Sequence, residues 1–309
     1  MTASGASTSA SGGAATLAVR PVLAQAVVRR NTWQGVRTVA RYAVLLIVLT
    51  FCLFPILWVI AMSVKLPGEY MRNPPVWIPQ NPTLVHFQLV MPSRGNLALK
   101  NSLIIAGGAT VLVMILGSLA AYSLARFNTG GRHFAFWLLS QRMMPPVVLI
   151  VPFFLVLRSL GQIHPALGLD SHGALIALYT VFNLPFVIWM MRSYFEAVPA
   201  EIEESSLVDG STRLGAFRRI TLPLAVPGVI ATGTFAFIFS WMEFLFAVVF
   251  TRTKAVTLPV AIAGFAGSQG SNWGQATALA VVAMLPVFAL ALLVQRHFVR
   301  GLTLGAIRG

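Results

Sequence analysis

Residues 42–64 read YAVLLIVLTFCLFPILWVIAMSV, an apolar stretch without a single charged side chain. A helix that crosses the hydrocarbon core of a bilayer needs about 20 predominantly apolar residues, so this stretch predicts a transmembrane helix. The rest of the chain has the same character. Hydrophobic residues make up 57% of it, charged residues only 10%, and the mean hydropathy is +0.80. A soluble domain carries about 25% charged residues, so the composition predicts an integral membrane protein.

Six apolar runs are long enough to span a membrane: Tyr42–Val64, Ser102–Ala125, Phe134–Leu157, Gly173–Met191, Leu222–Phe250 and Gln275–Val294. A seventh run, Ala255–Gly267, is too short and contains Pro259 and Gly264, so we expect a re-entrant or interfacial piece. The fifth run is longer than the bilayer core, and Pro223 and Pro227 predict that its first turn separates from the rest. The sequence therefore predicts an all-α integral membrane fold with six transmembrane helices.

The distribution of basic residues predicts the orientation. With the N-terminus inside, 14 of the 22 Lys and Arg residues fall in inner segments and seven in outer segments, while Arg142 lies within a span. An excess of basic residues marks the cytoplasmic side, so we expect both termini in the cytoplasm. Residues 1–40 would form a flexible cytoplasmic tail, residues 41–298 the six-helix domain, and residues 299–309 a cytoplasmic C-terminal tail.

The net charge of +14 also raises the question of nucleic acid. The basic residues lie mainly at the ends of apolar runs, where anionic lipid headgroups would meet them. No segment combines basic and aromatic residues in a pattern typical of nucleic-acid binding. The expected partner of these charges is therefore membrane lipid, not nucleic acid.

The loop after the fourth span, residues 193–222, is called the acidic loop here. Five of the eight acidic residues of the chain fall between Glu196 and Asp209. Pro199 suits the start of a helix, and the glutamates that follow it suit the positive end of the helix dipole. Gly210 would end this helix, and Ser211 would cap a second short one. On the residues alone, a docking surface for a protein and a solvated loop on the membrane remain equally open.

The acidic loop resembles the EAA loop of the permease subunits of ABC importers, which has Glu-Ala-Ala, a glycine and a downstream Ile-x-Leu-Pro. The residues that match are Glu204, Gly210, Ile220, Leu222 and Pro223. Ser205 and Ser206 replace the usual alanines and are also small. Several further stretches resemble the carbohydrate-uptake branch of this family: NSLI at 101–104, GSLAAYSLARF at 117–127, RMMPPVV at 142–148, FNLPF at 182–186, FIFSWMEFLF at 237–246 and the C-terminal residues 295–309.

The resemblance covers roughly residues 40–309 and implies the type I ABC importer permease fold, similar to the second permease of maltose-type sugar importers. Such a chain would form half of a translocation pore in the bacterial inner membrane. It would work with an ATPase subunit dimer, a second homologous permease and an extracytoplasmic sugar-binding protein. The residues expected to dock on the ATPase are Glu201, Glu204, Ser205, Ser206, Leu207, Asp209, Gly210, Arg213 and Leu214.

The chain itself shows no sign of catalysis. A phosphate-binding P-loop needs a Gly-Lys-Ser/Thr sequence, and none of the three lysines, Lys65, Lys100 and Lys254, follows a glycine. The five histidines form no zinc-binding motif, so we expect no metal site and no catalytic residue. The chain would bind no cofactor, and ATP and Mg would belong to the partner ATPase. We therefore expect a transport subunit that is not an enzyme.

Polar residues inside membrane spans mark candidate transport pathways. The residues expected along the path are Asn183, Ser240, Trp241, Glu243 and Phe244. Met242 stands where the branch usually has Asn. Arg142 and Glu243 lie at different depths, so we expect no ion pair between them. Pro145 and Pro146 leave carbonyls without their helical partners, and Arg142 is expected to donate to them.

Three alternative functions remain open. One is an ABC permease for another kind of solute, such as polyamines or phosphonates. The second is a gradient-driven secondary transporter, which would show paired half-repeats with broken helices, and no such internal symmetry is evident. The third is a membrane scaffold with no transport role, for which the Glu243 and Arg142 positions would be dispensable.

Overall fold

The computed structural model describes residues 20–70, 72–74, 76–266 and 272–305, and every regular element among them is helical. The chain divides into two units, residues 1–58 and 59–309, and each is described by itself. The described residues of the first unit all belong to one long helix, α1 (Arg20–Ser63), which contains Pro55 and continues into the second unit. Its apolar part, Gly35–Ser63, is long enough to cross a membrane.

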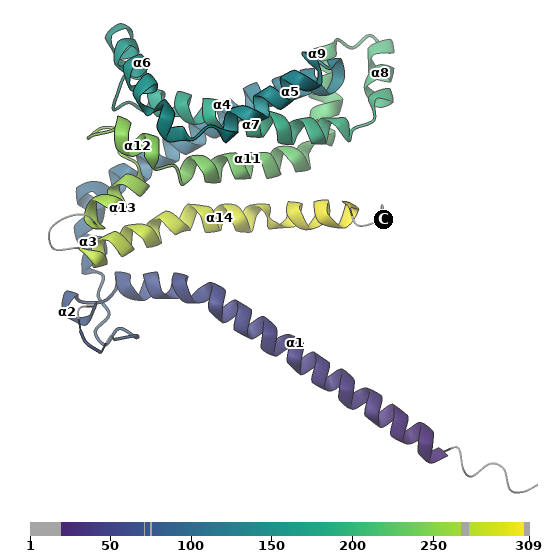
Figure 1. The fold of residues 1–309 in the computed structure, drawn as a ribbon, viewed down its shortest axis with the longest axis vertical. Coiled ribbons are helices and arrows are strands. Elements are labelled where there is room, and N and C mark those ends of the chain that lie inside the picture. The colour runs from purple at the N-terminus through teal and green to yellow at the C-terminus, as the bar shows by residue number, and fades with distance from the viewer. Residues whose placement is uncertain (1–19, 71, 75, 267–271, 306–309) are drawn as a thin grey trace, which may run out of the picture. The chain divides into compact units, whose positions relative to one another are not determined.

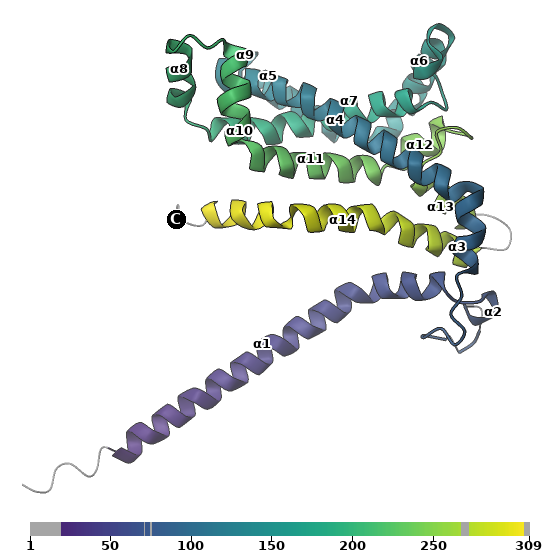
Figure 2. The same cartoon turned by 180° about the vertical axis from the view of Figure 1, so that it is seen from behind.

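The second unit contains the remaining helices, which Figures 1 and 2 show from opposite sides. The longer ones are α4 (Asn96–Phe127), α5 (Gly131–Ser140), α6 (Ile150–Ile163), α7 (His172–Glu196), α8 (Ala200–Val208), α11 (Val226–Trp241), α13 (Leu258–Ala266) and α14 (Trp273–Gly305). The shorter α-helices are α2 (Pro67–Tyr70), α3 (Val85–Val90), α9 (Arg213–Ala216), α10 (Leu222–Leu224) and α12 (Leu245–Phe250). The 3₁₀ and π segments are η1 (Met91–Gly95), η2 (Gln141–Met143), η3 (Pro146–Leu149), η4 (Pro165–Leu167) and η5 (Phe217–Thr221).

The core of this unit is the packing of α4 against α7 and α11 (Figure 1). Small residues bring the helices together, as is usual where lipid leaves no hydrophobic drive for association between them. At Gly117, an added Cβ atom would lie 2.5 Å from Val187 Cγ1, and at Gly108 it would lie 2.9 Å from Ile176 Cδ1. The buried aromatic side chain of Phe195 and its neighbours then fill the end of the bundle next to α8.

Five of the described helical segments are long and apolar enough to cross a membrane, and a bent pair brings the number to six. The pair is Arg213–Leu224 with Val226–Trp241, which meet at an angle of 79°. This is the break that Pro223 and Pro227 predict. The all-helical fold predicted from composition is therefore confirmed, and the seventh apolar run forms the short helix α13.

Two predicted spans differ from the structure. The third, Phe134–Leu157, is not one helix, because α5 ends at Ser140 and an extended Met144–Pro145 segment precedes η3 and α6. A residue before proline avoids the α conformation, and two consecutive prolines stop the helix. The fifth, Leu222–Phe250, ends at Trp241, and a non-helical turn separates it from α12.

The ends of the chain also differ from the expected boundaries. Helix α1 begins at Arg20, within the range 1–40 assigned to a flexible tail, and α14 continues to Gly305, past the boundary at residue 298. Residues 1–19 and 306–309 lie outside the described part of the chain.

Candidate functional site

The acidic loop lies at one end of α4, α7 and α11, and α12 and α13 lie at the other end (Figures 1 and 2). Its first helix, α8, follows Pro199 and ends at Val208, and Gly210 just beyond it takes the predicted left-handed conformation, with φ of +88°. The Ser211 amide donates to the Ser206 carbonyl at 3.0 Å, and the Gly210 amide donates to Leu207 at 3.1 Å. These two bonds form a Schellman motif, which requires a left-handed residue where Gly210 stands.

The second helix of the loop has a different cap from the predicted one. The Thr212 hydroxyl, not that of Ser211, accepts a hydrogen bond from the Gly215 amide at 3.1 Å. The prediction for Ser211 was wrong, because the helix begins at Arg213 and the residue that directly precedes it, with the extended backbone of an N-cap, is Thr212. Arg213 follows the cap, and its guanidinium carbon lies 4.8 Å from the centre of the Phe127 ring.

A buried carboxylate fastens α8 to the end of α4. Glu203 is 6% exposed, and its carboxylate accepts hydrogen bonds from Arg126 Nε at 2.9 Å, from the Thr221 hydroxyl at 2.8 Å and from the Tyr122 hydroxyl. Arg126 Nη2 also donates to the Val198 carbonyl at 2.9 Å. Burial alone would raise the pKa of Glu203, but these hydrogen bonds and the charge of Arg126 together lower it. We call these side chains the Glu203 anchor.

The sequence did not single out Glu203, which looked like one more acid in a polar helix. Its role depends on Arg126, 77 residues earlier in the chain. The available signal was the position of Arg126 at the end of the second apolar run, where a charge close to the membrane needs a partner.

The residues predicted to dock on another protein are gathered on this loop. Those with exposed side chains or backbone are Glu201, Glu204, Ser205, Asp209, Gly210, Arg213 and Leu214, and Ser206 and Leu207 are half-buried. Two apolar side chains that the prediction omitted are also exposed, Ile202 at 46% and Val208 at 88%. The anchored loop thus presents charged and apolar groups together.

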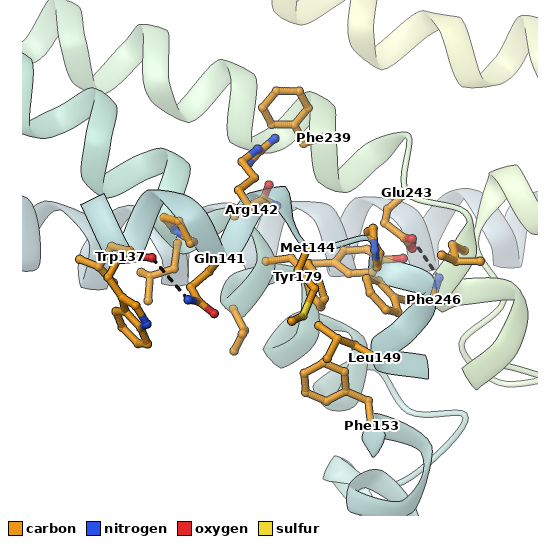
Figure 3. A pocket seen from close by; sticks show the side chains of 18 residues that line it. Trp137, Gln141, Arg142, Met144, Leu149, Phe153, Tyr179, Phe239, Glu243 and Phe246 are labelled. Atoms are coloured by element: carbon orange, nitrogen blue, oxygen red, sulfur yellow. Dashed lines mark hydrogen bonds between the residues drawn. The ribbon is translucent and has the colours of Figure 1, made fainter. Parts of the chain in front are cut away.

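A second candidate site is a cavity of about 580 Å³ lined by residues of α5, η2, η3, α6, α7, α11 and α12 and of the turn between the last two (Figure 3). Asn183 and Glu243, both predicted along the path, line this cavity, as does Arg142. Most of the other lining side chains are apolar or aromatic, among them Trp137, Phe153, Phe182, Phe239 and Phe246. A cavity of this size lies within the range of small-molecule sites.

The other predicted path residues lie outside the cavity lining. Ser240 is buried and accepts a hydrogen bond from Asn183 Nδ2 at 3.1 Å. Trp241 packs in the interior, where its ring stacks on Phe237 and its Nε1 donates to the Ala283 carbonyl at 3.2 Å. Phe244 is 42% exposed.

Glu243 and Arg142 have separate surroundings in the cavity (Figure 3). The Glu243 carboxylate accepts from the backbone amides of Phe246 at 2.9 Å and Ala247 at 3.3 Å, and so caps α12. The Arg142 guanidinium carbon lies 4.7 Å from the centre of the Phe239 ring and 5.1 Å from that of Phe186. The ion pairs found among the described residues are Arg126–Glu203 and Arg192–Glu196, neither of which joins these two side chains. The prediction that Arg142 donates hydrogen bonds to the carbonyls left without partners by Pro145 and Pro146 was wrong, because its guanidinium packs on the rings of Phe186 and Phe239 instead.

Tyr179 is a lining residue that the sequence did not indicate. It is 1% exposed, and its hydroxyl lies near the Glu243 carboxylate. Within the described part of the chain the hydroxyl meets no partner with hydrogen-bonding geometry.

At the opposite end of the bundle from α8, Asp170 holds the loop after α12. Its carboxylate accepts from the backbone amides of residues 252–255 at 3.0–3.3 Å and from the Thr253 hydroxyl at 3.1 Å. Burial would raise the pKa of Asp170, but the four amides lower it well below its usual range. Asn101 donates to the Lys254 and Val256 carbonyls, which fixes the same loop to α4. We call these contacts the Asp170 clamp.

The geometry gives a helical membrane protein with an anchored polar loop at one end and, between its helices, a mostly apolar cavity with a few polar side chains. Among the described residues, no group of three or more His, Cys, Asp or Glu side chains is placed to hold a metal ion.

Residues 113–304 match the model of the family described as "Binding-protein-dependent transport system inner membrane component". The chain is 36% identical over 272 residues to the sulfoquinovosyl glycerol transport system permease protein SmoH of Agrobacterium fabrum, covering 87% of this chain and 93% of that one. It is 35% identical over 283 residues to the trehalose transport system permease protein SugB of Mycobacterium tuberculosis, covering 89% and 100%.

The fold is also similar to a chain in the crystal structure of a bacterial ABC transporter involved in the import of the acidic polysaccharide alginate. The TM-score is 0.69 at 22% sequence identity, over 85% of this chain and 97% of that one. This chain belongs to the family of inner membrane components of binding-protein-dependent transport systems, and it is an inner membrane permease.

Proposed function

We propose that this chain is the permease subunit of an ATP-driven sugar importer and forms one half of its translocation pore. The observation that carries the proposal is the acidic loop, an exposed polar surface held by buried contacts to a long membrane helix. The sugar transport named in the descriptions of the two permease relatives supports the solute class.

In this proposal the acidic loop docks on a separate ATPase subunit. Glu204 would meet a basic side chain in a cleft of that subunit, and the exposed apolar side chains of Ile202 and Val208 would pack beside it. The Glu203 anchor supports this role, because a buried ion pair joins α8 to α4. Movement of the docked loop would therefore move α4 with it.

The remaining parts of the system would be separate chains. An ATPase dimer would bind ATP and Mg and carry out hydrolysis, so this chain would be non-catalytic. A second homologous permease would complete the pore, and an extracytoplasmic sugar-binding protein would deliver the solute. The cavity lined by Asn183 and Glu243 would form part of the path on this chain.

Transport by the assembled complex tests the proposal. The four components would be reconstituted in proteoliposomes, and uptake of the ligand eluted from the binding protein would be followed with and without ATP inside the vesicles. We expect uptake only with ATP and only with the intact ATPase. Uptake driven by an ion gradient without ATP would contradict the proposal and favour a secondary transporter.

The coupling step is tested in the same vesicles with Glu204→Ala. We expect uptake to fall while ATP hydrolysis continues, because the docked surface no longer transmits movement. Glu196→Ala, on the same loop before α8, is the matched control and should retain uptake. Equal uptake by wild type and Glu204→Ala would remove Glu204 from the docking surface.

A further inference from the structure

The cavity of about 580 Å³ contains one cationic side chain whose partners are unusual. Arg142 is held over the rings of Phe186 and Phe239, at 5.1 Å and 4.7 Å from its guanidinium carbon. Ring faces attract a guanidinium, but they accept none of its five N–H donors in an ordinary hydrogen bond. Among the described residues, the ion pairs are Arg126–Glu203 and Arg192–Glu196, and neither involves Arg142.

Glu243 does not use the charge of Arg142, although it lines the same cavity. Its two carboxylate oxygens accept from the amides of Phe246 and Ala247, which lie in the first turn of α12. Figure 3 shows Arg142 directed toward Phe239 and Glu243 directed toward Phe246. The Glu243 carboxylate is therefore already hydrogen-bonded to backbone amides, whereas the N–H groups of the Arg142 guanidinium can still donate hydrogen bonds to a ligand.

The rest of the cavity suits a hydroxylated ring. Tyr179 contributes a buried hydroxyl without a hydrogen-bonding partner in the described part of the chain, and Asn183 contributes an amide. Trp137, Phe153 and Phe246 add aromatic surface, against which the apolar face of a sugar ring can pack. Most of the lining is apolar with a few placed polar groups, as is usual for ligand sites.

We propose that this cavity binds a sugar carrying an anionic substituent, a carboxylate or a sulfonate, with the oxyanion on the Arg142 guanidinium. Two N–H groups of the guanidinium match two oxygens of such a group. The ring hydroxyls would meet Tyr179 and Asn183. This inference rests on the proposed function and narrows its substrate class from sugars in general to acidic sugars.

The first test identifies the charge of the solute. The binding protein is purified together with the assembled transporter, the saccharide is released by denaturing it, and its mass and charge are measured. We expect an anionic saccharide. A neutral saccharide would overturn the inference and leave the proposed sugar importer intact.

The second test asks whether Arg142 is the residue that recognises the negative charge of the solute. Proteoliposomes containing the whole complex are given the released acidic saccharide or its chemically neutralised counterpart, and the two uptake rates are compared. In Arg142→Gln we expect the preference for the acidic form to fall about 10-fold or more, since a hydrogen bond to a charged group is lost. Arg142→Lys should keep part of the preference.

Arg158→Gln is the matched control, because Arg158 is exposed on α6 and does not line the cavity. It should keep the wild-type preference. A folding defect in Arg142→Gln would lower both uptake rates equally, so an unchanged ratio in that variant would overturn the inference. If wild-type vesicles take up neither form with ATP, the proposed function itself fails.

Discussion

Glu203 shows how much a single side chain can contribute to this protein. Its carboxylate and the Arg126 guanidinium are both largely buried, with side-chain exposures of 8% and 11%. Removing one member of a buried pair leaves the other charge without compensation. The exposed pair Arg192–Glu196, at 2.7 Å, provides a natural comparison, because exposed pairs contribute little.

We therefore expect Glu203→Ala to destabilise the protein by about 3–5 kcal/mol, since Arg126 stays buried without its partner. Glu196→Ala should change the stability by at most about 1 kcal/mol. The thermal unfolding midpoint of the purified complex measures both effects. Equal midpoints for the two variants would show that the Glu203 anchor does not hold α8.

The pH dependence of stability follows from the lowered pKa values of Glu203 and Asp170. A carboxylate whose pKa is lower when folded contributes its full stability above its unfolded value, about 4. That contribution is lost as the pH falls through the lower, folded value. We expect the thermal unfolding midpoint to decrease when the pH is lowered below about 4. In a Glu203→Gln, Asp170→Asn double variant the midpoint should decrease less steeply with falling pH. A parallel drop in the double variant would assign the acid sensitivity to other groups.

For single residues, the sequence predicted local backbone features better than it predicted which side chains meet in the fold. The pattern around Gly210 predicted a left-handed residue at the end of a helix, because the requirement is local. The roles of Glu203 and Asp170 could not be read from the sequence, since the charged partner of Glu203 lies 77 residues away and the amides that bind Asp170 lie 82 or more residues away. Trp241 looked like a path residue, but its surroundings depend on α14, which supplies the Ala283 carbonyl.

At the scale of the helices, close packing of α4 on α7 depends on Gly117. Gly117→Ala would place a methyl group 2.5 Å from Val187 Cγ1, so we expect a loss of about 1–3 kcal/mol from overpacking. A double variant with Val187→Ala should recover much of that loss, because the clashing methyl groups are gone. The yield and unfolding midpoint of the purified protein measure the effect.

Gly107→Ala is the control on the same helix, since an added Cβ atom there meets nothing within 4 Å. It should be as stable as the wild type. If Gly107→Ala and Gly117→Ala are equally stable, the α4–α7 contact tolerates more separation than its geometry indicates.

The turn between α8 and α9 gives a separate prediction. In Gly210→Ala the added Cβ atom has free space, so the cost comes only from the positive φ and is about 1–2 kcal/mol. Because Gly210 is part of the proposed docking loop, we expect uptake to fall clearly even though the thermal unfolding midpoint changes only slightly. Gly264→Ala, in α13 without a positive φ or a nearby atom, should leave uptake unchanged.

The elements themselves were largely predictable, because length and hydropathy alone define a membrane helix. The breaks within the apolar runs were harder to predict. Residues 134–157 form one apolar run by hydropathy, but Pro145 and Pro146 interrupt the helix there. Similarly, α11 ends at Trp241, and the Glu243 carboxylate then accepts from the Phe246 amide in the first turn of a new helix, α12.

At the scale of the whole molecule, the orientation in the membrane remains a prediction of the charge distribution. Cys52 is the single cysteine, so a Cys52→Ser variant contains no cysteine and single reporter cysteines can be introduced into it. We expect a membrane-impermeant maleimide to label Ser205→Cys only after the cytoplasmic side is opened. It should label Gln162→Cys, at the end of α6, in intact cells stripped of the outer membrane. The reverse pattern would place the acidic loop outside and exclude ATPase docking.

The Asp170 clamp has a consequence for how this protein can change over time. The donors that hold its loop are mostly backbone amides, which every residue except proline supplies. The side chains of Arg252 and Lys254 are exposed and take no part in the clamp's hydrogen bonds. Their chemistry is therefore free to vary while the path of the backbone stays fixed. One rigid frame can carry different outward-pointing side chains, so a lineage could refit this surface to a new partner without refolding the membrane domain.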